Sequence, residues 1–113
     1  MERTVAVQAH TIPDRLPLRL SVRDLVEVGR RDSVWPAFVF VQAAAGSGWV
    51  PARHLSAGTG TAEVLVGYDT TELPTQVGDV LEILERDDES GWHWCRAADG
   101  ACGWVPARTL EPE

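Results

Sequence analysis

Short stretches in which apolar and polar residues alternate run through the whole chain, broken every few positions by Gly, Pro, Asp or Ser. Such alternation is typical of half-buried β-strands, whose successive side chains point to opposite faces. Little of the chain shows the three- and four-residue spacing of an amphipathic helix. The pattern therefore predicts an all-β protein.

The two halves of the chain share one order of strands and turns. In the second half, the expected strands are at 63–66, 80–84, 92–96 and 102–105, followed by a one-turn 3₁₀ segment at 106–108 and a return to the sheet at Leu110. In the first half, the corresponding strands are expected at 5–7, 25–28, 38–41 and 48–51. Five short strands at these spacings indicate a small barrel.

A perfect repeat supports this division. The sequence Gly-Trp-Val-Pro-Ala-Arg occurs at 48–53 and again at 103–108. Because the chain has 113 residues, a repeat at about half its length indicates two copies of one small domain. We therefore expect two tandem five-stranded barrels, a divergent one at 1–56 and a second at 62–113, joined by a short linker of small residues.

The second copy resembles a Src-homology-3 (SH3) domain over residues 64–110. The residues that carry the resemblance are Tyr68-Asp69 after the first strand, Glu72-Leu73, Gly78-Asp79 before an apolar strand, the acidic loop 87–89 before Trp92, and Gly103 to Pro106. The first copy is less similar, chiefly through 48–55. Together the copies resemble the paired variant SH3 domains of bacterial proteins.

The resemblance implies a protein–protein interaction module that binds proline-rich peptides in the polyproline II conformation. The implied groove residues are Tyr68, Trp92, Trp104 and Pro106. The implied acidic residues, which would pair with an Arg or Lys of the peptide, are Asp69, Glu72, Asp87, Asp88 and Glu89.

The first copy offers a weaker set of candidates for the same groove. The positions are Trp49, Pro51, His54 and either Trp35 or Phe38, depending on where a gap is placed. Ala9 stands where the second copy has Tyr68.

Strand alternation predicts that Trp92 and Trp94 share one face of their strand, while His93 and Cys95 share the other. Because Cys95 suits a barrel interior, the two tryptophans would lie outside and need a partner. That partner is an extended peptide or the neighbouring domain. The chain could alternatively be a structural or regulatory accessory subunit, with its tryptophans buried against a folded partner.

The charge is uneven along the chain, which has a net charge of −7. Residues 57–113 carry twelve acidic side chains and three arginines, whereas residues 1–56 carry five acidic side chains and seven arginines. The acidic half should attract a basic partner. The small positive excess of the first half, next to an acidic neighbour, argues against nucleic-acid binding.

Nothing in the sequence indicates catalysis or a cofactor. The histidines, His10, His54 and His93, are scattered without metal-ligand spacing, and no phosphate-binding loop or nucleophile elbow is present. We therefore expect a non-enzymatic protein without metal or cofactor. No apolar run has the length of a membrane span, and no secretory leader is visible, so the cytoplasm is the expected location, with both cysteines as free thiols.

Overall fold

The structure, a computed structural model, describes all 113 residues and contains only strands, turns and two short 3₁₀ segments. The all-β expectation is confirmed. The elements are β1 (Glu2–Ala6), β2 (Arg19–Leu20), β3 (Leu25–Arg31), β4 (Phe38–Ala43), β5 (Gly46–Pro51), η1 (Ala52–His54), β6 (Gly60–Glu63), β7 (Tyr68–Asp69), β8 (Val80–Asp87), β9 (Trp92–Arg96), β10 (Cys102–Pro106), η2 (Ala107–Thr109) and β11 (Leu110–Pro112).

The strands form three sheets. Their orders are β10-β9-β8-β1-β11, β5-β4-β3-β6 and the two-stranded β2-β7. None of these sheets closes on itself, so the expected pair of closed five-stranded barrels is not confirmed. No helix in the structure has the length and apolar character needed to cross a membrane.

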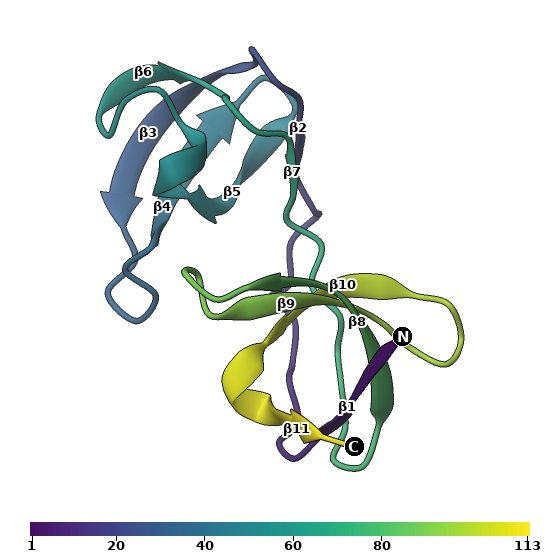
Figure 1. The fold of residues 1–113 in the computed structure, drawn as a ribbon. Coiled ribbons are helices and arrows are strands. Elements are labelled where there is room, and N and C mark those ends of the chain that lie inside the picture. Colours follow the sequence, from purple (N-terminus) through teal and green to yellow (C-terminus); the bar gives the residue numbers. More distant parts are fainter. The chain divides into compact units, whose positions relative to one another are not determined.

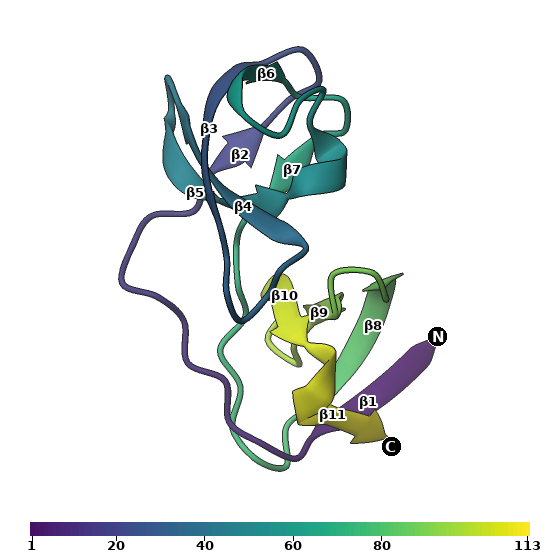
Figure 2. The ribbon, with the colours of Figure 1, turned by 90° about the vertical axis from the view of Figure 1, so that its left-hand side faces the viewer.

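The chain divides into two compact units whose boundaries differ from the expected 1–56 and 62–113. Unit 1 consists of residues 1–15 and 71–113, and unit 2 consists of residues 16–70. The chain therefore passes from one unit to the other twice, as Figures 1 and 2 show. Unit 2 is one continuous segment, whereas unit 1 is assembled from the two ends of the chain.

The reason for the different boundaries is an exchange of first strands between the two copies of the repeat. In unit 1, β1 pairs with β8, with Thr4 opposite Leu81, and on its other side with β11 (Figure 1). In unit 2, β6 pairs with β3, with Ala62 opposite Val26. Because Val26 and Leu81 occupy matching places of the repeat, β1 and β6 play the same part, each in the unit of the other copy.

The exchange continues into the loops that follow these strands. In unit 1, His10 and Thr75 form a mutual bridge, with both N–H···O distances at 3.0 Å. In unit 2, β2 and β7 pair, with Leu20 opposite Tyr68. His10 lies six positions after Thr4, and Tyr68 lies six positions after Ala62. His10 in unit 1 therefore takes the place that Tyr68 takes in unit 2.

Each unit has its own apolar core. The core of unit 2 contains Leu18, Leu20, Val26, Val39, Val41, Val50, Leu55, Ala62 and Val64, all less than 9 % exposed. The core of unit 1 is smaller and contains Leu73, Leu81, Cys95 and Val105. Thr4 and Ala6 of β1 are also buried and add to the small core of unit 1.

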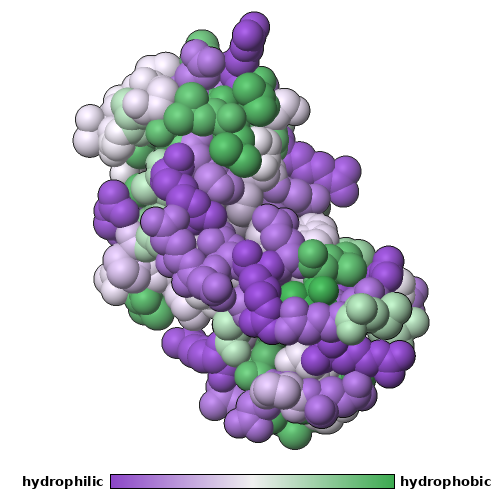
Figure 3. All heavy atoms as spheres, in the orientation of Figure 1, coloured by the Kyte–Doolittle hydropathy of each residue, from purple (hydrophilic) through white to green (hydrophobic).

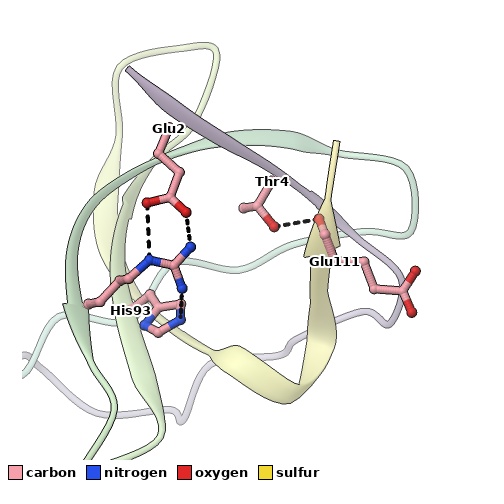
Figure 4. A network of polar contacts seen from close by, with 5 residues as sticks. Glu2, Thr4, His93 and Glu111 are labelled. Atoms are coloured by element: carbon pink, nitrogen blue, oxygen red, sulfur yellow. Dashed lines mark hydrogen bonds and ion pairs between the residues drawn. The ribbon is translucent and has the colours of Figure 1, made fainter.

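Polar contacts also attach β1 to its neighbours in unit 1 (Figure 4). Arg86 of β8 forms a two-pronged ion pair with Glu2, with Nε 3.0 Å from Oε1, and its Nη1 lies 3.4 Å from Nε2 of His93. The Thr4 hydroxyl donates to the carbonyl of Glu111 at 2.7 Å. Glu2 and Arg86 are each 48 % exposed, so their pair contributes only about 0.2–1 kcal/mol.

The turn before the longest strand of each unit needs a left-handed residue. Gly78 has a φ of 95° in unit 1, and Arg23 stands at the matching place with a φ of 79°. A side chain in this conformation costs about 1–2 kcal/mol, of which the flexibility of glycine in the unfolded chain cancels part. We expect Arg23→Gly to stabilise unit 2 by about 0.5 kcal/mol in thermal unfolding. Gly78→Ala should destabilise unit 1, and a stabilising Gly78→Ala would contradict this reading.

Candidate functional site

The outward faces of β9 and β10 carry the aromatic residues that the sequence singled out. His93 is 5 % exposed and Cys95 is fully buried, whereas Trp92 and Trp94 are half-buried on the opposite face. The predicted alternation along this strand is confirmed. The two tryptophan rings therefore reach the surface of unit 1.

Trp92 is the centre of a small polar and aromatic cluster in unit 1. The ring of His10 meets the Trp92 ring edge to face, with centroids 5.3 Å apart. Nε2 of the same histidine lies 2.9 Å from Oε1 of Glu72. The side chains of His10 and Glu72 are 14 % and 23 % exposed. An aromatic face, an imidazole and a carboxylate thus meet at one accessible place.

Trp104 and Pro106 lie on β10, the strand that pairs with the strand of Trp92. Trp104 is 7 % exposed and Pro106 is buried, opposite Trp92 in the strand register. The backbone of Trp104 holds the segment that carries Glu72, because its N–H donates to the carbonyl of Thr71 at 2.9 Å and its carbonyl accepts from the N–H of Leu73 at 3.1 Å. Both residues therefore fix the geometry of the cluster and offer little surface of their own.

The acidic loop before Trp92 divides into a structural and an exposed part. Asp87 is 8 % exposed and its carboxylate accepts from the N–H of Ser90 at 3.3 Å, while its carbonyl accepts from the N–H of Gly91 at 2.9 Å. Asp87 thus stabilises the turn. Asp88 and Glu89 are exposed in this turn.

Tyr68 and Asp69 lie in unit 2, so the structure does not bring them together with Trp92 in one unit. The Tyr68 ring meets the ring of His54 edge to face at 5.3 Å, and the Asp69 carboxylate lies 3.2 Å from Nε of Arg19. The sequence analysis grouped Tyr68 with Trp92 because each copy of the repeat was expected to keep its own first strand.

The weaker candidates of the first copy belong to unit 2, where the ring of His54 meets that of Tyr68. Phe38 faces Pro51, just as Trp92 faces Pro106, so Phe38 and not Trp35 corresponds to the groove tryptophan. Phe38 is only 7 % exposed, and Trp35 lies in the preceding turn, where its carbonyl accepts from the N–H of Phe38. Trp49 packs against Phe40, away from this group, with centroids 5.2 Å apart.

His10 is the residue of this candidate cluster that the sequence reasoning did not single out. Aligning the copies through the repeat at 48–53 and 103–108 places Ala9 opposite Tyr68, one position away. Counting from the paired residues Thr4 and Ala62 places His10 there instead. The strand register that corrects the alignment is visible only once the exchange is known.

The charge is distributed by unit and not by sequence half. Unit 1 contains twelve acidic side chains and five arginines and thus carries the whole net charge of −7. Unit 2 contains five of each and is neutral. The basic first half of the sequence is therefore not a structural unit.

Apolar side chains reach the surface in separate patches on the face drawn in Figure 3, between hydrophilic ones. Single exposed apolar residues of this kind are ordinary for a folded protein. The structure contains no group of three or more His, Cys, Asp or Glu side chains that could hold a metal ion. The cluster around Trp92 is therefore the best candidate site in unit 1.

The two cysteines are free thiols in different environments. Cys95 is fully buried, and burial raises its pKa from 9.0 to about 11 despite the opposing charge of Arg86. Cys102 is partly exposed. At pH 8.5 we expect iodoacetamide to modify Cys102 in the folded protein and Cys95 only after unfolding, because the thiolate is the reactive form. Mass spectrometry after timed quenching measures this, and equal rates would contradict the described burial.

The raised pKa of Cys95 also has a consequence for stability. A folded state that favours the protonated thiol is stabilised relative to the unfolded state only below the unfolded pKa of 9.0. This contribution is lost as the pH rises from about 9 toward 11.

Residues 62–113 match the family model described as the variant SH3 domain. No curated protein matches the chain. The matched range begins in β6 and includes β7, both of which the structure assigns to unit 2, so the match runs across the exchange.

Proposed function

We propose that the chain is a non-enzymatic interaction module in which unit 1 binds an extended, basic, proline-rich peptide. SH3 domains generally mediate protein–protein interactions, and residues 62–113 match that family. The observation that carries the proposal is the cluster of Trp92, His10 and Glu72, which presents an aromatic face next to a carboxylate. A proline ring would pack on Trp92, and a basic side chain would pair with the carboxylate.

Charge supports the basic character of the ligand. Unit 1 carries the full net charge of −7, and its exposed Asp88 and Glu89 lie in the turn that leads to Trp92. Such a field raises the encounter rate with a basic segment and is weakened by salt. Of the acidic residues that the sequence proposed, we retain Glu72, Asp88 and Glu89 as ligand contacts, and we assign Asp87 to the turn.

We further interpret both units as SH3-like, each with a first strand taken from the other copy. Unit 2 has Tyr68, Phe38, Pro51 and His54 at the places that correspond to His10, Trp92, Pro106 and Thr109 of unit 1. Because Phe38 is nearly buried and unit 2 is neutral, we propose that unit 1 is the principal reader of basic peptides.

The test is a titration of the full chain with a peptide that contains two Pro-x-x-Pro motifs and a terminal arginine. Trp92→Ala should weaken binding about thirtyfold or more, because a central aromatic contact contributes about 2 kcal/mol or more. Glu72→Gln should weaken it about five- to tenfold. Tyr68→Phe is the matched control and should leave the affinity unchanged, because Tyr68 lies in unit 2.

Amide spectra of each variant show whether unit 1 remains folded, and Trp92→Phe keeps a ring at the site if Trp92→Ala unfolds it. Saturable shifts around Trp92 and Glu72 support the proposal. Absence of shifts at millimolar peptide, or a loss of binding in Tyr68→Phe equal to that in Trp92→Ala, would contradict it. The first of these results would favour the accessory-subunit alternative, in which a folded partner covers the tryptophans.

A further inference from the structure

Each unit carries a pair of aromatic rings that face each other across two neighbouring strands of its larger sheet. In unit 2 the pair is Phe40 and Trp49, directly opposite each other on β4 and β5, with centroids 5.2 Å apart. In unit 1 the pair is Trp94 and Trp104, opposite each other on β9 and β10, with centroids 5.3 Å apart. Both pairs meet edge to face, so the two faces are built alike.

An arginine completes the face of unit 2. The guanidinium carbon of Arg30 lies 5.7 Å from the Phe40 centroid and 5.2 Å from the Trp49 centroid. These distances are those of cation–π contacts, which stabilise a guanidinium over an aromatic face. Unit 2 thus shows that two facing aromatic rings on neighbouring strands can hold a guanidinium group.

Glu85 stands in unit 1 where unit 2 has Arg30. Arg31 faces Val39 and Arg86 faces His93, each directly after an irregularity of the strand, so the preceding residues correspond. Glu85 is exposed and lies opposite Trp94 in the register. Unit 1 therefore has the same kind of ring pair as unit 2, but it carries the carboxylate of Glu85 where unit 2 carries the guanidinium of Arg30.

The nearby acidic residue is already engaged. Glu82 forms an ion pair with Arg96 on the neighbouring strand, and its side chain is only 19 % exposed. Glu85 is thus the carboxylate on this part of the sheet that can receive a cation from outside. The net charge of −7 on unit 1 attracts such a cation from a distance.

We propose that the face formed by Trp94 and Glu85, with the nearly buried Trp104 ring packed against Trp94, binds an arginine side chain of a partner protein, in the manner in which unit 2 holds Arg30. Arginine is favoured over lysine because its planar guanidinium stacks on aromatic rings and pairs with a carboxylate through two hydrogen bonds. The site uses neither Trp92 nor a proline ring. It therefore does not depend on the proposed groove for proline-rich peptides.

The probe is a proline-free peptide, acetyl-Gly-Arg-Gly-Gly-Arg-Gly-amide, together with its twin that has lysine in place of arginine. The readout is the indole N–H resonance of each tryptophan in the full chain. We expect a saturable shift of the Trp94 resonance with the arginine peptide. The affinity for the lysine peptide should be at least threefold lower. Trp92→Ala should retain the Trp94 shift, which separates this site from the groove.

Glu85→Arg is the decisive variant, because it gives unit 1 its own copy of Arg30. It should move the Trp94 resonance in the free protein and reduce peptide affinity at least tenfold. Glu111→Arg makes the same change of charge elsewhere in unit 1 and should reduce the affinity less than twofold. The reverse change, Arg30→Glu, should produce a new saturable shift at Trp49.

Three results would overturn the proposal. Glu85→Arg could bind the peptide as the wild type does, or Glu111→Arg could lose as much affinity, which would mean that only the overall charge matters. A peptide-induced shift at Trp92 without one at Trp94 would place the arginine in the groove.

Discussion

Removal of residues 1–7 is expected to unfold unit 1 and to leave unit 2 intact. β1 lies between β8 and β11, so its loss divides the five-stranded sheet. It also removes the buried Thr4 and Ala6, which are 3 % and 1 % exposed, from a unit whose core is small. The combined loss exceeds the margin of about 5 kcal/mol by which small domains are stable. Unit 2 contains all of its own strands in residues 16–70.

The five tryptophans report this experiment unit by unit. Trp92, Trp94 and Trp104 lie in unit 1, and Trp35 and Trp49 lie in unit 2. In the truncated chain, the indole resonances of the first group should collapse to random-coil positions while those of the second group remain dispersed. The isolated segment 16–70 should give the same dispersed resonances. Removing only Met1, which precedes β1, is the control and should change neither group.

A different outcome would contradict the exchange. If the truncated chain kept unit 1 folded and lost unit 2, then residues 60–69 would have taken the place of β1. That result would mean that each copy prefers its own first strand. Ala6→Glu tests the same contact without truncation, because it places a charge at a position that is 1 % exposed, and it should unfold unit 1 alone.

Gly103→Ala is expected to destabilise unit 1 strongly, whereas Gly48→Ala should be tolerated by unit 2. A Cβ at Gly103 would lie 2.7 Å from the backbone carbon of Glu72 and 2.7 Å from the nitrogen of Leu73, so the backbone would have to move. Such overpacking costs about 1–3 kcal/mol. A Cβ at Gly48 meets only side-chain atoms at 3.5 Å, which is ordinary contact.

These two glycines are a matched pair, because they open the two copies of the repeated sequence. Urea unfolding followed by tryptophan indole resonances measures each unit separately. Gly103→Ala should lower the unfolding free energy of unit 1 by about 2 kcal/mol and weaken peptide binding, since the displaced segment carries Glu72. Equal effects of the two substitutions on their own units would contradict the close approach of this segment to β10.

Much of the fold follows from the sequence because strand alternation is a local property. The strands expected at 92–96 and 102–105 correspond to β9 and β10, and the burial of His93 and Cys95 follows the predicted parity. The 3₁₀ segment expected at 106–108 corresponds to η2, one residue further along the chain. These features depend on neighbours in sequence, which the pattern records.

The ends of the chain could not be assigned in this way. β1 and β6 are both short strands that bury alternate residues, and either one could complete either sheet. The choice depends on contacts between residues far apart in sequence, such as Thr4 with Leu81. The pairing of β1 and β6 also decides whether His10 or Tyr68 lies in the unit of Trp92. The sequence analysis therefore grouped Tyr68 with Trp92 and left His10 out.

The measurement that tests this account most directly is a nuclear Overhauser spectrum of the aromatic protons in the full chain. The exchange predicts contacts between the rings of His10 and Trp92 and between those of Tyr68 and His54, each pair having centroids 5.3 Å apart. Both sets of cross-peaks together would establish which first strand, β1 or β6, completes which unit. Cross-peaks between Tyr68 and Trp92, with none between His10 and Trp92, would contradict the exchange and return Tyr68 to the peptide groove.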